Sequence, residues 1–95
     1  MQFLVIARDG TDADALARRL ATREAHLDNV KKYKETGEIL IGGALLSAEG
    51  TMNGSALMVN FADRAALDAY LSTDPYTVNG VWQTFEITEM KVAGL

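Results

Sequence analysis

Residues 38–61 read EILIGGALLSAEGTMNGSALMVNF, and this stretch decides the fold because it places two apolar segments on either side of a loop. The segments 38–46 and 56–61 are rich in branched residues, which is typical of β-strands. The residues between them have loop chemistry, and Asn53-Gly54 is the strongest turn signal in the chain. The stretch therefore predicts two consecutive antiparallel strands in the middle of the sequence.

Two adjacent glycines, Gly42 and Gly43, lie inside the first of these strands. Glycine in a strand indicates a bulge or a close approach of another backbone. A glycine pair alone is far too weak a signal to indicate a phosphate-binding loop.

The segment 12–37, upstream of the hairpin, is predicted to be helical. Its apolar residues form two stripes of helical spacing, Leu16 with Leu20 and Leu27 with Val30. The two stripes do not join across residues 21–24, so we expect a bend or a second helix start there, with Thr22 as an N-cap. Gly37 is expected to end the helix.

The remaining elements complete the order strand, helix, strand, strand, helix, strand. They are a first strand FLVIA (3–7), a helix RAALDAYL (64–71) capped by Asp63, and a last strand VWQTFEITEMKV (81–92). This order predicts a single α+β domain over residues 1–95 with a ferredoxin-like fold. In that fold a four-stranded antiparallel sheet carries both helices on one face.

Both faces of the predicted first and third strands are apolar. In the first strand, Phe3, Val5 and Ala7 alternate with Leu4 and Ile6. Two helices cover only one face of a four-stranded sheet, and the other face would be a large exposed apolar patch. We therefore expect a homodimer in which two sheets pack face to face.

Composition excludes several classes of function. The chain has no cysteine and one histidine, which makes a structural zinc site unlikely. Its formal net charge of −4 argues against nucleic-acid binding, which needs a basic patch. No apolar run approaches the roughly 20 residues of a membrane-spanning helix, and the N-terminus lacks the basic start of a secretory signal. We expect a soluble cytoplasmic protein.

The only histidine, His26, lies in the sequence REAHL (23–27). It falls on the flank of the second helical stripe, at the same face spacing as Val30 and Tyr33. Most histidines take no part in catalysis, so a partly buried residue with one hydrogen bond is one interpretation. A flanking position predicts that His26→Ala costs about 1 kcal/mol, the scale of typical point changes.

Asp74 and Pro75 form the only Asp-Pro dipeptide, in the sequence TDPY (73–76). An N-cap aspartate followed by a proline at the first helical position explains this dipeptide without any function. A capping carboxylate nevertheless keeps lone pairs free for a second partner. If the fold brings Asp74 to His26, the carboxylate would fix the tautomer of the imidazole and stabilise its protonated form.

Other candidates carry weaker signals. Arg23, three residues before His26, could bind an anionic substrate group, although such arginines are more often solvated surface residues. Trp82 could line a pocket or a dimer contact, but a core position is the more common role. Ser47 and Ser55 lack the local signature of a catalytic nucleophile.

Taken in order and spacing, several of these motifs resemble those of the YCII-like family, and the resemblance covers essentially the whole chain. They are R-E-A-H-L at Arg23 to Leu27, EILIGGAL after Gly37, Gly54-Ser55 at the start of the third strand, and D-P-Y at Asp74 to Tyr76 followed by Gly80. Members of that family commonly have Gly-Pro where this chain has Gly43-Ala44, so the rim of the pocket is expected to differ there.

The resemblance implies a ferredoxin-like chain that dimerises through its sheet as a dimeric α+β barrel. It also implies that His26 and Asp74 face a common pocket as an active-site pair. We therefore predict that their side chains lie within direct or one-water hydrogen-bond reach, about 3–5 Å. One characterised branch of the family is a dehalogenating lyase that acts on a chlorinated muconate-type ring-cleavage product.

Two classes of function fit these observations. The first is a small enzyme that needs no cofactor and no metal, in which His26 acts as general acid/base, Asp74 orients it and Arg23 contacts a small anionic or carbonyl-containing ligand. Its reaction would be of lyase or isomerase type, such as dehalogenation or the conversion of a muconate or lactone. The alternative is a non-catalytic dimeric domain that binds a small acidic metabolite. A third hypothesis, a monooxygenase without heme or flavin, is based on fold analogy alone.

Overall fold

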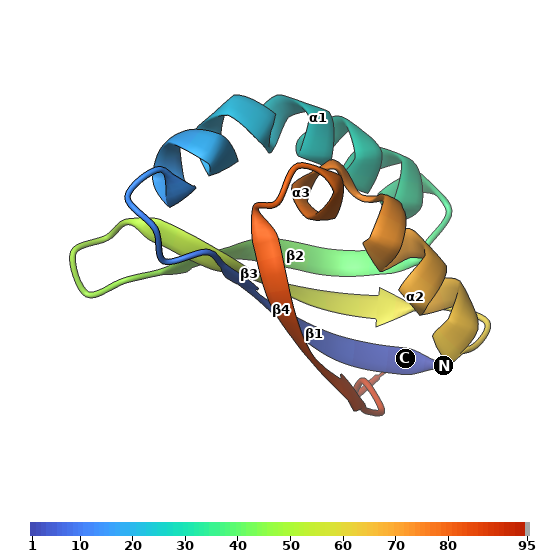
Figure 1. The fold of residues 1–95 in the computed structure, drawn as a ribbon. Helices are drawn as coiled ribbons and strands as arrows, with labels where there is room; N and C mark the ends of the chain where they lie inside the picture. Colours follow the sequence, from blue (N-terminus) through green and yellow to red (C-terminus); the bar gives the residue numbers. More distant parts are fainter. Residues whose placement is uncertain (95) are drawn as a thin grey trace.

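The chain forms a four-stranded antiparallel sheet with all three helices on one face, as Figure 1 shows. The elements are β1 (Gln2–Asp9), α1 (Ala15–Glu35), β2 (Ile39–Leu46), β3 (Met52–Asn60), α2 (Arg64–Thr73), α3 (Pro75–Val78) and β4 (Trp82–Glu89). The strand order across the sheet is β2-β3-β1-β4. This computed structural model describes residues 1–94, so the end of the domain predicted over residues 1–95 lies outside the described residues. The predicted ferredoxin-like α+β fold is confirmed.

The main core lies between the sheet and the helices. Phe3, Val5 and Ala7 of β1 point toward the helices and are buried. They pack with inward residues of β3 and with the apolar side of α2: Leu57, Val59, Leu67, Tyr70 and Leu71. Alternation along β1 and along β3 from Ser55 to Val59 therefore works as predicted, because side chains two residues apart share a face.

The opposite face of the sheet is also apolar, and none of the helices in Figure 1 covers it. Leu4 and Ile6 of β1 are half-buried and pair in register with Met58 and Ala56 of β3. Beside Met58, Ile41 of β2 is 63% exposed. The predicted apolar character of both faces is confirmed, and the bare face is the surface that the dimer prediction concerns.

Helix α1 differs from its prediction in two ways. It runs without interruption from Ala15 to Glu35, and the Thr22 hydroxyl donates to the Arg18 carbonyl oxygen at 2.9 Å inside the helix, so Thr22 is not an N-cap. The predicted apolar stripes are also wrong for their leucines, because Leu16, Leu20 and Leu27 are 39%, 53% and 45% exposed, whereas Val30 packs against the core as predicted.

The inward side of α1 is instead polar in its first half. Its buried residues are Arg19, Thr22 and His26. Buried polar groups are tolerated when they find hydrogen-bond partners, and here the sheet and α3 supply them. Further along the helix, Val30 and Tyr33 pack against the core.

The turn between β2 and β3 lies earlier than predicted. The Gly50 N–H donates to the Ser47 carbonyl at 2.9 Å, and Gly50 has the positive φ of 84° that favours glycine. Asn53 and Gly54 belong to β3, which begins at Met52. Gly54 serves a different purpose there: a Cβ atom on it would lie 2.8 Å from the Ala7 carbonyl oxygen, so the glycine lets β1 approach β3 closely.

Strand β2 contains a bulge at Leu40. Ile39 pairs with Val59 while Ile41 pairs with the next residue, Met58, so Leu40 is an extra residue on β2. The sequence predicted a bulge or a close approach at the glycines. The bulge lies two residues before Gly42, and the neighbour that approaches Gly42 closely is a side chain rather than a backbone, because a Cβ there would collide with Leu57.

The bulge decides which side chains of β2 face the helices. Ile39 faces them and is 2% exposed. Beyond the bulge, Gly42 lies opposite Leu57 and Ala44 opposite Ser55, both on the helix side of β3. Gly42 and Ala44, two of the smallest residues, therefore face α1, and the space between them and the helix is not filled by side chains of β2.

Candidate functional site

Asp74 joins α2 to α3 and accounts for both helix boundaries. Its backbone is extended (φ −61°, ψ 136°), as expected of a residue before proline, and this ends α2. Its Oδ1 accepts a hydrogen bond from the Tyr76 N–H at 2.9 Å, and Pro75 stands at the first position of α3. The predicted capping role of Asp74 is confirmed.

The Asp74 carboxylate is fully buried and accepts four hydrogen bonds. Oδ1 also accepts from Nδ1 of His26 at 2.8 Å. Oδ2 accepts from the Tyr70 hydroxyl at 2.7 Å and from Nδ2 of Asn29 at 3.4 Å. Burial raises the pKa of Asp74, but the hydrogen bond and charge of His26, with the donors Tyr76 N–H and Tyr70, outweigh it and lower the pKa overall.

The Tyr70 hydroxyl is a permanent donor in this network. Burial, together with the charge of Asp74 and the hydrogen bond to it, raises the pKa of Tyr70 far above its ordinary value. Asp74 is thus held as an anion, and Tyr70 holds its proton.

His26 is oriented on three sides. Its ring stacks on Tyr76, with centroids 3.9 Å apart and planes 10° from parallel, and it meets Trp82 in a T-shaped arrangement with ring centroids 5.1 Å apart. Because a carboxylate accepts hydrogen bonds and does not donate them, the contact with Asp74 puts the proton of the neutral ring on Nδ1. Nε2 is then left with a free lone pair. The predicted contact between His26 and Asp74 is confirmed as a direct hydrogen bond.

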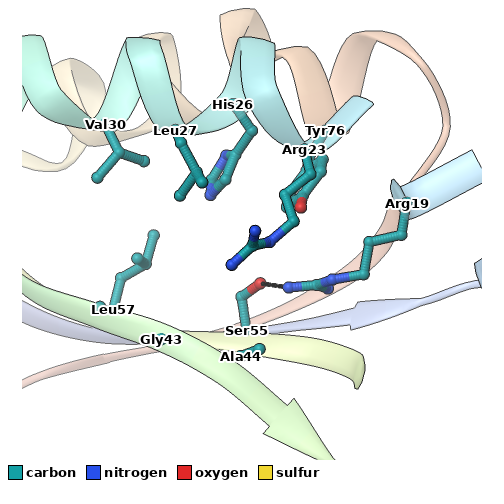
Figure 2. Close-up of a pocket in the computed structure, with 11 residues that line it drawn as sticks. Arg19, Arg23, His26, Leu27, Val30, Gly43, Ala44, Ser55, Leu57 and Tyr76 are labelled. Carbon is teal, nitrogen blue, oxygen red and sulfur yellow. Dashed lines mark hydrogen bonds between the residues drawn. The ribbon is translucent and has the colours of Figure 1, made fainter. Parts of the chain in front are cut away.

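A cavity of about 200 Å³ lies between α1 and the segments 42–44 of β2 and 55–57 of β3 (Figure 2). Its lining residues are Arg19, Arg23, His26, Leu27, Val30, Gly42, Gly43, Ala44, Ser55, Leu57 and Tyr76. This volume is below the roughly 300–1,000 Å³ of pockets for drug-sized ligands, so it suits a molecule of about one ring. His26 projects into it from α1, and Gly43 and Ala44 contribute to its opposite wall.

Arg23, the predicted anion contact, extends its guanidinium into this cavity (Figure 2). No carboxylate among residues 1–94 forms an ion pair with it. The structure therefore places all three predicted site residues together: His26 and Arg23 line the cavity, and Asp74 stands behind His26.

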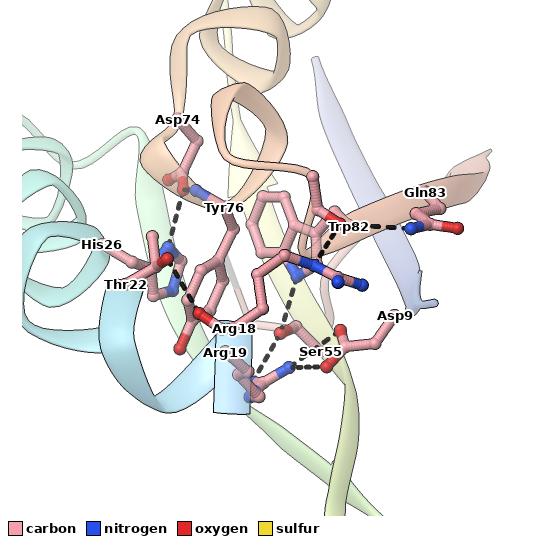
Figure 3. A network of polar contacts seen from close by, with 11 residues as sticks. Asp9, Arg18, Arg19, Thr22, His26, Ser55, Asp74, Tyr76, Trp82 and Gln83 are labelled. Carbon is pink, nitrogen blue, oxygen red and sulfur yellow. Dashed lines mark hydrogen bonds and ion pairs between the residues drawn. The ribbon is translucent and has the colours of Figure 1, made fainter. Parts of the chain in front are cut away.

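A second buried polar cluster next to the cavity was not predicted (Figure 3). Nη1 of Arg19 lies 3.0 Å from both carboxylate oxygens of Asp9, and its Nη2 donates to Oγ of Ser55 at 3.0 Å. The Trp82 indole N–H donates to the same Ser55 oxygen at 3.0 Å. The guanidinium of Arg19 also lies 4.8 Å from the centre of the Tyr76 ring.

The sequence did contain a signal for this cluster. Arg19, Arg23 and His26 recur at four- and three-residue spacing, which is the spacing of one helix face. Read as a polar stripe that faces inward, it would have pointed to Arg19. Trp82 is buried, as its core interpretation predicts, and also contacts His26. Ser47 lies in the turn between β2 and β3 and does not line the cavity.

Two further properties concern the described part of the chain as a whole. Within residues 1–94, no three or more histidine or acidic side chains are grouped so that they could hold a metal ion. None of the helices described in Figure 1 has the length and apolar character required to cross a membrane.

Comparison with known proteins identifies relatives over nearly the full length. Residues 1–91 match the family model of the YCII-related domain. Protein YciI of Escherichia coli O6:H1 is 27% identical over 97 residues, which cover 96% of this chain and 97% of that protein. Protein YciI of Shigella flexneri matches with the same identity and coverage.

Solved structures share the fold. The 5-chloro-2-hydroxyhydroquinone dehydrochlorinase of Burkholderia phenoliruptrix, in complex with 2,5-dihydroxybenzoquinone, is 25% identical with a TM-score of 0.84, over 96% of this chain and 94% of that one. A dimeric ferredoxin-like protein from Jannaschia sp. is 14% identical with a TM-score of 0.52, over 96% and 98% of the two chains. On the match of the family model to residues 1–91, the chain belongs to the YCII-related domain family.

Proposed function

We propose that this protein is a small enzyme in which His26 transfers a proton and Asp74 orients and stabilises it. The observation that carries the proposal is the 2.8 Å hydrogen bond from Nδ1 of His26 to the buried Asp74, on a ring that lines a cavity. This bond leaves the basic Nε2 available on the other side of the ring. An imidazole held in this way is suited to general acid/base catalysis.

The proposed chemistry is the removal of a proton from a hydroxyl group, or from a carbon next to a carbonyl, of a small unsaturated substrate. The imidazolium that forms is stabilised by the Asp74 carboxylate, which stays ionised because it accepts four hydrogen bonds. The reaction is of lyase or isomerase type and requires no cofactor, because only a proton and a leaving group move.

Support for a lyase comes from the dehydrochlorinase described above. In the corresponding reaction here, His26 takes a hydroxyl proton from a chlorinated hydroxyhydroquinone and the ring is reprotonated at the carbon that bears chlorine. Chloride then leaves with the electron pair of the C–Cl bond while a second hydroxyl group loses its proton and becomes the second carbonyl, so the sum is loss of HCl with formation of a quinone. No oxidant is consumed.

The test is to incubate the protein with 5-chloro-2-hydroxyhydroquinone and to measure the release of chloride. A panel of unsaturated carboxylates and lactones is assayed in the same way for turnover. Turnover that disappears in His26→Gln supports the enzyme. Ligand binding without turnover of any compound by the wild-type protein would favour the alternative, a non-catalytic domain that holds a small acidic metabolite.

We also propose that two copies of the chain pack sheet to sheet, through the apolar face that carries Leu4, Ile41 and Met58. Light scattering is expected to give twice the mass of the 95-residue chain. Leu4→Glu or Ile41→Glu should shift it to the monomer, because a charge buried in an apolar interface costs several kcal/mol.

Leu20→Glu is the matched control, since Leu20 is 53% exposed on α1, on the other side of the sheet. It should leave the mass unchanged. A monomeric wild-type protein at micromolar concentration, or a dimer that tolerates both sheet substitutions, would contradict the face-to-face arrangement.

A further inference from the structure

We propose that Ser55 is a specificity residue whose hydroxyl is held as a hydrogen-bond donor and that, with Arg23, it binds an anionic oxygen of the ligand across the cavity from His26. The inference rests on the proposed function for the identity of the site, and it adds the chemical class of the ligand. Ser55 lies on β3, on the wall of the cavity that faces α1 (Figure 2).

The direction of the Ser55 hydroxyl follows from its two neighbours. A serine oxygen has two lone pairs and one proton. Nη2 of Arg19 and Nε1 of Trp82 each donate to this oxygen at 3.0 Å, which occupies both lone pairs. The hydroxyl forms no hydrogen bond to an acceptor within residues 1–94, so its proton is available to a molecule in the cavity that Ser55 lines.

The two donors that fix Ser55 are themselves immobile. Arg19 is 3% exposed and is held by both oxygens of Asp9. Trp82 is 2% exposed and packs against Tyr76, with ring centroids 5.4 Å apart. A donor that is oriented before binding costs little ordering when the ligand arrives, so the hydroxyl discriminates strongly between an acceptor and a donor in the same place.

Charge at this end of the cavity favours an anion. Arg19 is paired with Asp9 and His26 with Asp74, whereas Arg23 forms no ion pair with residues 1–94. Its guanidinium therefore supplies the uncompensated positive charge beside the Ser55 donor. Guanidinium and hydroxyl together suit a carboxylate, enolate or phenolate oxygen.

The ligand is thus inferred to be a small planar acid. Its oxyanion contacts Ser55 and Arg23, and the hydrogen that His26 removes lies on the α1 side of the same ring. Gly42 and Ala44 lie on β2 opposite Leu57 and Ser55 and line the cavity. Because neither residue has a large side chain, they leave room for such a ligand.

The experiment compares benzoate with benzamide, which has the same shape but no charge and places N–H donors at that position. Both are titrated into the wild-type protein and its variants by NMR. Benzoate should bind more tightly than benzamide. Ser55→Ala should weaken benzoate about 10-fold or more, because a hydrogen bond to a charged group is lost. The affinity for benzamide should change by no more than about twofold, and Ser55→Thr, which keeps the hydroxyl, should retain benzoate binding.

Two further variants protect the test against misfolding, because Ser55→Ala leaves two buried donors without an acceptor. Ser55→Cys keeps the size of the side chain but offers only a weak donor, and it should also weaken benzoate. Arg23→Gln changes an exposed residue and should weaken benzoate about 10-fold. Arg64→Gln, which removes the same charge from an exposed pair with Asp68 on α2, should have no effect.

The inference is overturned if benzoate does not bind, if it binds no better than benzamide, or if folded Ser55→Ala and Ser55→Cys proteins bind it as the wild type does. Repeating the titration in His26→Gln separates this inference from the proposed function. If the preference for benzoate persists there and depends on Ser55, the anion site stands even when His26 proves irrelevant to turnover. If turnover depends on His26 but the affinity for benzoate is the same in the Ser55 variants as in the wild type, the proposed function is supported and the proposed anion site is contradicted.

Discussion

His26→Gln is expected to lower kcat/KM about 10²- to 10⁴-fold, the range that a positioned general acid/base contributes. Glutamine offers an N–H to Asp74 in place of Nδ1 of His26, so the buried carboxylate keeps a partner. It cannot accept a proton at the position of Nε2. The measurement is steady-state turnover of the best substrate from the panel, with the mass in solution and the thermal midpoint recorded for the same samples.

The choice of glutamine over alanine follows from the structure. A position on the flank of a helical stripe predicted that His26→Ala would cost about 1 kcal/mol. The ring is instead 6% exposed, stacked on Tyr76 and bonded to Asp74. Alanine would leave a cavity and a buried carboxylate with one partner fewer, so we expect about 3 kcal/mol. Unchanged turnover in a folded His26→Gln protein would return this residue to a purely structural role.

Asp74→Ala is expected to destabilise the fold by about 3–5 kcal/mol, because several buried donors lose their acceptor at once. It removes the acceptor of four hydrogen bonds, including the N-cap of α3 and the partner of the Tyr70 hydroxyl. A donor left buried without an acceptor pays its full desolvation cost. Urea unfolding monitored by tryptophan fluorescence measures the loss, since Trp82 is the only tryptophan and is buried.

Asp74→Asn is the matched variant. Its side-chain oxygen still accepts from the Tyr76 N–H and from His26, so the loss of stability should be much smaller, about 1 kcal/mol. Its turnover should be lower than that of the wild type but higher than that of a His26 variant, because an amide orients the imidazole without stabilising its charged form. Equal stability of Asp74→Ala and Asp74→Asn would show that the hydrogen bonds to the carboxylate contribute little.

The dependence of folding stability on pH tests the role of Asp74 separately. The pKa of Asp74 in the folded protein lies below its ordinary value of 3.8, so its ionised form favours folding. That contribution is fully present above the unfolded pKa and is lost as the pH falls through the folded pKa. The wild-type protein should therefore lose more stability than Asp74→Asn when the pH is lowered below about 4.

The fold was predictable because it depends on local signals that tertiary contacts did not override. Alternation in β1 and the cap at Asp63, which accepts from the Ala66 N–H at 2.8 Å, are both formed as expected. The contact between His26 and Asp74 was predicted through the family resemblance, since no spacing rule links residues 48 positions apart in the chain.

The cluster of Asp9, Arg19 and Ser55 was missed for the same physical reason that reversed the two sides of α1. Leucines at helical spacing predict the buried side of a helix only when the polar side finds no buried partners for its hydrogen bonds and charges. In α1 the polar side finds a carboxylate, a hydroxyl and an aromatic ring to contact, and these partners come from three other elements. Their meeting depends on the completed fold, which a local pattern does not contain.

The bulge at Leu40 has a consequence for how this chain and its relatives can diverge. Ile39 and Gly42 are three residues apart, so a regular strand would put them on opposite faces, and the extra residue puts both on the side of the helices. The strand is thereby divided into two independent parts. The part up to Ile39 is constrained by the core, and the part from Gly42 to Ala44 lines the cavity. Mutation can reshape the second part, which includes Ala44, without disturbing the packing of Ile39 in the core. The shape of the cavity can therefore change in this chain while the core contacts that stabilise the same strand are kept.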